Sequence, residues 1–137
     1  MFKIIAEPLV WWPVTFPGVA DNGEVVENKI ELRFVILDED AMEAFSIATG
    51  KLLASKLVGE DEEVLAPEDR PTSSAVAQQA LQPIVRDWRS VAAENGEPLP
   101  FNADNFRALL RVPNVFAAIL RSYGACRAGR AEVRSGN

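Results

Sequence analysis

The feature that most constrains the fold is the spacing of apolar side chains, which changes about a quarter of the way along the chain. Before that point, apolar residues alternate with other residues in two stretches, 9–17 and 28–37. Alternation with a period of two is typical of strands with one buried face. The polar loop at 21–24 lies between the two stretches and predicts an antiparallel β-hairpin. Pro13 has no N–H group, which indicates that the first strand is an edge strand or is bulged.

From residue 38 onward the spacing is helical. Asp38 or Asp40 can cap a helix, and Gly50 is expected to end it. Leucine and valine residues within 52–58 predict one or two further helical turns. The acidic run 60–63 lacks the regular spacing of a calcium- or magnesium-binding loop, so we interpret it as a solvated loop or helix end.

The second half of the chain predicts three more helices. Apolar side chains at four-residue steps predict a helix over 76–91, which Pro83 should kink or divide. Asn102 can cap a short helix that follows a proline-rich, extended connection. Pro113 fits the first turn of a last helix, which Gly124 is expected to end.

Together these patterns predict an α+β fold that is mostly α, with an N-terminal antiparallel β-hairpin followed by about four or five α-helices. A length of 137 residues corresponds to about one domain. We expect residues 1–124 to form that domain. Residues 125–137 contain one larger aliphatic side chain, Val133, and are expected to form a flexible tail.

Composition argues against an enzyme. The chain has no histidine, which removes the usual general base near neutral pH and most zinc and iron sites. Its one cysteine, Cys126, can form neither an intrachain disulfide nor a four-thiolate metal site. No spacing singles out a pair of carboxylates. We therefore predict no catalytic residue, no metal site and no cofactor.

The sequence also indicates in which cellular compartment the protein is expected. No apolar run has the length of a signal-peptide core or approaches the roughly 18 residues of a membrane span. The lone cysteine fits a reducing compartment. We therefore expect a protein of the cytoplasm with no membrane partner.

The net charge of −6 is the sum of two unlike parts: residues 1–69 carry −10 and residues 70–137 carry +4. Such a division fits head-to-tail self-association, and it can also mark a nucleic-acid surface. An acidic chain without interleaved aromatic residues argues against nucleic acid. The later arginines can equally form a solvated face and tail: Arg107, Arg111, Arg121, Arg127, Arg130 and Arg134.

Two stretches carry a resemblance. The more specific one contains Asp87-Trp88, then Gly96-Glu97-Pro98-Leu99-Pro100-Phe101-Asn102, then Leu109-Leu110 and Val112-Pro113, and ends at Tyr123. The other contains Trp12-Pro13-Val14, a glycine-containing loop and Arg33-Phe34. Together they resemble the tail assembly chaperones of long, non-contractile-tailed phages and prophages. The resemblance covers most of residues 10–123, and the glycine- and arginine-containing tail after Tyr123 has no counterpart in the family pattern.

The resemblance implies a non-catalytic role in the host cytoplasm. Such chaperones bind the tape measure protein, keep its apolar helical segments soluble and help to recruit the major tail tube protein. They also tend to self-associate, and many have a longer form made by ribosomal frameshifting. The alternative hypothesis is a minor structural tail protein that is retained in the particle.

Five residues are candidates for contact with a partner: Trp11, Trp12, Trp88, Leu99 and Phe101. Trp11 and Trp12 are adjacent on a predicted strand and should point to opposite faces, so one is expected to be buried and the other available to a partner. Trp88 can instead anchor the core. The proline-rich segment that ends at Phe101 can be a rigid connector, or a docking segment that inserts Phe101 into a partner or another copy.

Overall fold

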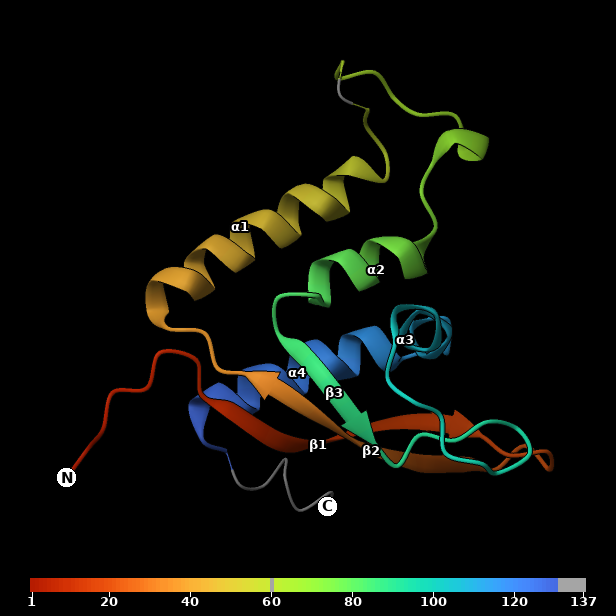
Figure 1. Ribbon diagram of the computed structural model, residues 1–137. Coiled ribbons are helices and arrows are strands. Elements are labelled where there is room, and N and C mark those ends of the chain that lie inside the picture. Colours follow the sequence, from red (N-terminus) through yellow and green to blue (C-terminus); the bar gives the residue numbers. More distant parts are fainter. Residues whose placement is uncertain (60, 131–137) are drawn as a thin grey trace.

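The computed structural model describes residues 1–59 and 61–130 (Figure 1). These residues form a three-stranded antiparallel sheet, four α-helices and one short 3-10 helix. In chain order the elements are β1 (Leu9–Val19), β2 (Val25–Val35), α1 (Glu39–Ser55), the 3-10 helix (Pro67–Asp69), α2 (Ser73–Leu81), β3 (Val85–Arg89), α3 (Ala103–Leu110) and α4 (Val115–Ala128). Figure 1 shows α1 running above α2, away from the sheet.

Strands β1 and β2 form a long hairpin. They pair from Leu9 with Val35 at one end to Val19 with Val25 at the other. The turn between them requires a residue with positive φ, and Gly23 adopts φ 86° there. The pairing therefore continues to the turn, beyond the end of the first predicted strand at residue 17.

The predicted fold class, a hairpin followed only by helices, is wrong. Strand β3 follows α2 in the chain and pairs with β2, which gives the sheet order β1-β2-β3. The predicted helix over 76–91 stops at Leu81. Pro83 explains this end, because it has no N–H for the helical hydrogen bond and its ring clashes with the preceding turn. The chain beyond Pro83 becomes a strand, on which Trp88 is buried.

Strand β1 lies at an edge of the sheet, and α4 covers its outer backbone groups. The carbonyl of Thr15 accepts a hydrogen bond from the Arg121 guanidinium at 3.0 Å, and that of Pro17 accepts one from the Asn114 amide at 3.3 Å. Backbone groups of alternate residues point the same way, so Pro13 lies in this outward row, where its missing N–H costs nothing. An edge covered in this way resists pairing with a further strand.

The core lies between the inner face of the sheet and helices α2, α3 and α4. Its members are apolar side chains that are nearly or wholly removed from solvent, including Trp12, Val14, Leu32, Phe34, Leu81, Ile84, Trp88, Phe106, Leu110, Val115 and Ile119. Helix α1 adds one buried residue, Phe45, which is 8% exposed. Most of α1 is therefore outside the core.

Two predicted helix ends are wrong, because α1 continues beyond Gly50 and α4 beyond Gly124. A glycine commonly ends a helix when it takes the left-handed conformation, as Gly129 does with φ 71°. Gly50 and Gly124 do not have positive φ. Residues 125–128 accordingly belong to α4, and residues 131–137 of the predicted tail lie outside the described part of the chain.

Tyr123 joins α4 to the junction between β2 and α1. Its hydroxyl donates to the carbonyl of Val35 at 2.7 Å and accepts from the amide of Leu37 at 3.0 Å. The side chain is 1% exposed, and burial raises the pKa of Tyr123 because an ionised phenolate would lose its hydration. One hydroxyl therefore satisfies two backbone groups at the point where the chain changes from strand to helix.

Replacing Tyr123 by phenylalanine should lower the free energy of unfolding by about 1–3 kcal/mol, because the buried Val35 carbonyl and Leu37 amide each lose a hydrogen bond. Denaturation by urea measures the change, with an unaltered slope against denaturant. The control is Ser46→Ala, which removes an exposed hydroxyl from α1 and should change stability by no more than about 0.5 kcal/mol. Equal stability of the two variants would contradict this role for the hydroxyl.

Candidate functional site

Helix α1 is fixed to the domain at its first turn. The Asp38 carboxylate caps it by accepting from the amide of Ala41 at 2.8 Å. Arg127 of α4 donates to the carbonyl of Leu37 at 3.2 Å and forms an ion pair with Glu39 at 3.0 Å. Beyond this anchor, α1 packs mainly on α2. The rest of the helix is free to present side chains to a partner.

An open groove of about 350 Å³ lies between α1 and α2. We call it the α1–α2 groove. Most side chains that line it are small or apolar, and they include Ala41, Ala44, Phe45, Ala48 and Leu52 of α1 and Ala80 of α2, while Gln79 of α2 is polar. None of the residues that line it carries a charge. Alanine side chains allow another chain to approach the α1 backbone closely, so the groove is suited to an apolar segment.

Thr49 places an unsatisfied polar atom at this groove. Its Oγ1 is buried and forms no hydrogen bond within the described part of the chain. A buried hydroxyl without a partner is unfavourable and is uncommon in folded proteins. Because the atom is already shielded from solvent, it is a cost of the local packing and does not mark a contact with a ligand.

The same part of the molecule exposes further large apolar side chains. They lie on α1 and on the connection that follows it: Ile47, Leu53, Leu57, Val58 and Val64. Val64 is 77% exposed and Ile47 is 55% exposed. Single exposed apolar residues are ordinary, but a gathering on one projecting element is typical of interaction surfaces.

Three of the five predicted partner-binding residues form one packed cluster. The Trp88 indole donates to the carbonyl of Leu99 at 2.8 Å, and Phe101 packs edge-on against Trp88 with ring centres 5.3 Å apart. Leu99 and Phe101 are partly buried, and Trp88 is 5% exposed. The proline-rich segment therefore packs back onto β3, and contact with a partner stays a prediction for these three residues.

Trp11 and Trp12 lie on opposite faces of β1. Trp12 is in the core, and its indole nitrogen is buried without a hydrogen-bond partner within the described residues. Trp11 is half-buried on the outer face, where the guanidinium of Arg89 lies 4.1 Å and that of Arg33 5.7 Å from the ring centre. Two cations already cover part of Trp11. The geometry places neither tryptophan in the α1–α2 groove.

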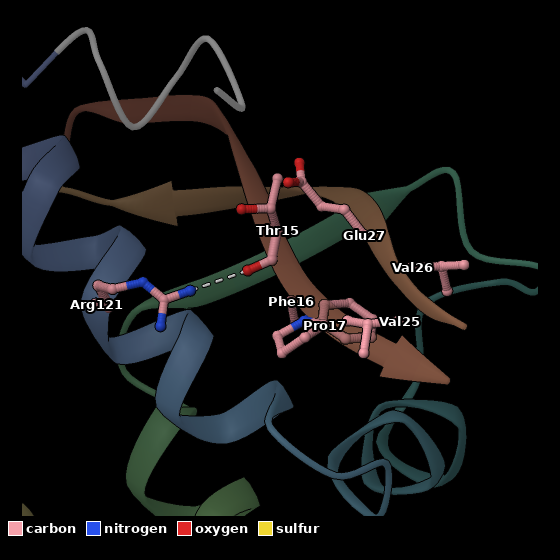
Figure 2. Close-up of a pocket in the computed structure, with 7 residues that line it drawn as sticks. All are labelled: Thr15, Phe16, Pro17, Val25, Val26, Glu27 and Arg121. Carbon is pink, nitrogen blue, oxygen red and sulfur yellow. Dashed lines mark hydrogen bonds between the residues drawn. The ribbon is translucent and has the colours of Figure 1, made fainter. Parts of the chain in front are cut away.

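A second concavity, of about 310 Å³, lies between the hairpin and α4 (Figure 2). Figure 2 shows Arg121 reaching from α4 to the carbonyl of Thr15, while the Glu27 carboxylate points away. The one cation here is thus engaged with the edge of β1. Arg121 is bonded to the backbone and Glu27 points away, so these two charged side chains do not converge, whereas small-molecule sites usually have a few convergent polar groups.

Sequence reasoning missed the α1–α2 groove. Ala41, Phe45 and Ala48 do indicate the apolar face of a helix, but an apolar face is normally covered by the core. The signal that could have revealed an open groove is the composition of this face. Alanine predominates on it, and small side chains fill little core volume.

Within the described residues there is no group of three metal-ligating side chains, and no helix has both the length and the apolarity to cross a membrane. No protein-family model, no curated protein and no solved structure matches this chain.

Cys126 lies within α4, partly buried, and does not belong to a tail. Burial raises the pKa of its thiol from 9.0 to about 11, because the thiolate would lose hydration. The raised pKa makes Cys126 a poor nucleophile near neutral pH.

Alkylation of Cys126 by iodoacetamide at pH 9 should be at least about tenfold slower in the folded protein than in urea, since the thiolate is the reacting form. The rate in the folded protein should rise toward pH 11. Because the pKa in the fold is raised, the thiol stabilises the fold fully below pH 9, and this contribution is lost as the pH approaches 11. Rapid labelling with a midpoint near pH 9 would contradict the burial. Cys126→Ala gives the background rate.

Proposed function

We propose that this protein is a tail assembly chaperone of a long-tailed phage or prophage, which binds apolar helical segments of the tape measure protein in the host cytoplasm. The observation that carries the proposal is the α1–α2 groove. The groove is open and uncharged, and it is lined mostly by small or apolar side chains of α1 and α2. Docking of an amphipathic helix in an apolar groove is a common way to recognise helical segments.

The resemblance of residues 84–113 to this family supports the identity of the partner. In the structure, this stretch forms β3, the segment packed on Trp88, and α3. Its aromatic residues contact one another, with Phe106 also 6.3 Å from Trp88. We infer that the motif stabilises the fold and that the groove, on other elements, receives the partner.

A groove lined by several alanines and by larger apolar side chains also suits a chaperone, because such a lining does not select one particular partner side chain. Deep pockets select particular side chains, whereas a shallow apolar groove accepts many sequences of similar shape and polarity. A tape measure protein presents many different apolar helical segments. The proposed role is binding and release, without a chemical step.

The first test is co-expression with the tape measure protein of the same phage. Wild-type protein should increase the soluble fraction of that protein. Ala48→Glu places a carboxylate in the groove, and burying it against an apolar helix should weaken binding at least about tenfold, or about 1.4 kcal/mol. The control is Ala54→Glu, an exposed position on α1 that does not line the groove. If wild-type protein leaves the soluble fraction unchanged, the proposal fails.

A second test distinguishes a chaperone from a minor structural tail protein. A chaperone leaves before assembly is complete, so mass spectrometry of purified virions should detect no peptide of this chain. The tape measure and tail tube proteins in the same sample are the positive control. Detection of the chain at a fixed number of copies per particle would favour the structural protein instead.

A further inference from the structure

The chain exposes an apolar segment before β1. Every residue from Met1 to Glu7 is exposed. Phe2 is 89% exposed, Ile4 93% and Ile5 63%. Three large apolar side chains in a run of four residues are unfavourable in water, and exposed clusters of this kind usually mark a contact surface.

The base of this segment is fixed, and its course leads away from the groove. The carbonyl of Pro8 accepts a hydrogen bond from the amide of Ile36 at 2.9 Å, next to the start of α1. Figure 1 shows the segment extending from this point away from both α1 and α2. The segment is therefore directed outward, where another molecule can contact it.

The α1–α2 groove and the segment have matching chemistry. The groove is apolar and lined by uncharged residues, and within residues 2–5 of the segment Lys3 is the one charged side chain. In an extended chain, Phe2 and Ile4 point to one side, and Lys3 and Ile5 point to the other. Phe2 and Ile4 can thus enter a groove while Lys3 stays in water.

We propose that residues 2–5 of one copy bind in the α1–α2 groove of a second copy. Each copy has one segment and one groove, so the contact is heterologous and joins copies head to tail. The contact is apolar, unlike pairing between the acidic and basic halves of two copies. If the groove also receives the tape measure protein, as the proposed function holds, segment and partner compete for it.

Two variants with complementary defects test the contact by sedimentation velocity. The triple substitution Phe2→Ser, Ile4→Ser and Ile5→Ser removes the segment's apolar side chains and leaves the groove intact. Ala44→Glu blocks the groove at an exposed position and leaves the segment intact. Wild-type protein should form larger species as concentration rises, and each variant alone should stay monomeric. An equimolar mixture should form a dimer, because the intact segment of the Ala44→Glu variant binds the intact groove of the triple variant. The dimer should not extend, because the remaining segment and the remaining groove both carry substitutions.

The matched controls are Lys3→Ser in the segment and Ala54→Glu on α1 outside the groove, and both should assemble like wild type. Raising salt from about 0.1 to about 1 M should not weaken assembly, whereas a contact made by exposed charges should weaken.

Three outcomes overturn the proposal. In the first, wild-type protein is monomeric at every concentration. In the second, the triple variant assembles like wild type. In the third, the mixture fails to form a dimer. If the first outcome is found and the triple variant also binds an apolar dye more strongly than wild type, the segment covers the groove of its own chain. Solubility of the tape measure protein with the triple variant tests the proposed function separately, because that variant keeps its groove.

Discussion

The hydrogen bonds of one buried hydroxyl hold helix α4 to the junction between β2 and α1. Tyr123 bonds both to the last residue of β2 and to the segment that leads into α1, and Arg127, one turn later, bonds to the same segment and to Glu39. Helix α4 thus holds a junction that lies some ninety residues earlier in the sequence. Without these bonds the change from strand to helix would leave buried backbone groups unpaired, which is costly.

The anchor explains why the groove is open. Helix α1 is fixed at its first turn and packs chiefly on α2, and Phe45 is the one buried residue of α1. Tertiary packing normally provides most of the stability of a helix. Here the cap at Asp38 and the ion pair of Glu39 with Arg127 add to that limited packing. A helix held in this way can leave an apolar face uncovered, which is what a binding surface requires.

The hairpin could be predicted from the sequence because apolar residues alternate along 10–16 and 30–36 and Gly23 lies at the turn. Strand β3 could not. Val85 and Trp88 are three residues apart, a helical spacing, yet both are buried because a register shift opposite Arg33 and Phe34 disturbs the alternation. The burial of Trp88 can be predicted from the sequence. The presence of an open groove cannot, because whether an apolar helix face is covered depends on elements distant in the chain.

The small size of the groove bears on how such a protein could act. About 350 Å³ accommodates only a few side chains, so a single contact between α1 and a helical segment would be weak. Weak contacts suit a partner that must be released, and they become effective when several copies hold one long chain, because linked contacts raise the effective concentration of the next. Head-to-tail contact would then matter in two ways. It would keep the grooves covered when no partner is present, and it would gather copies where a long partner needs them.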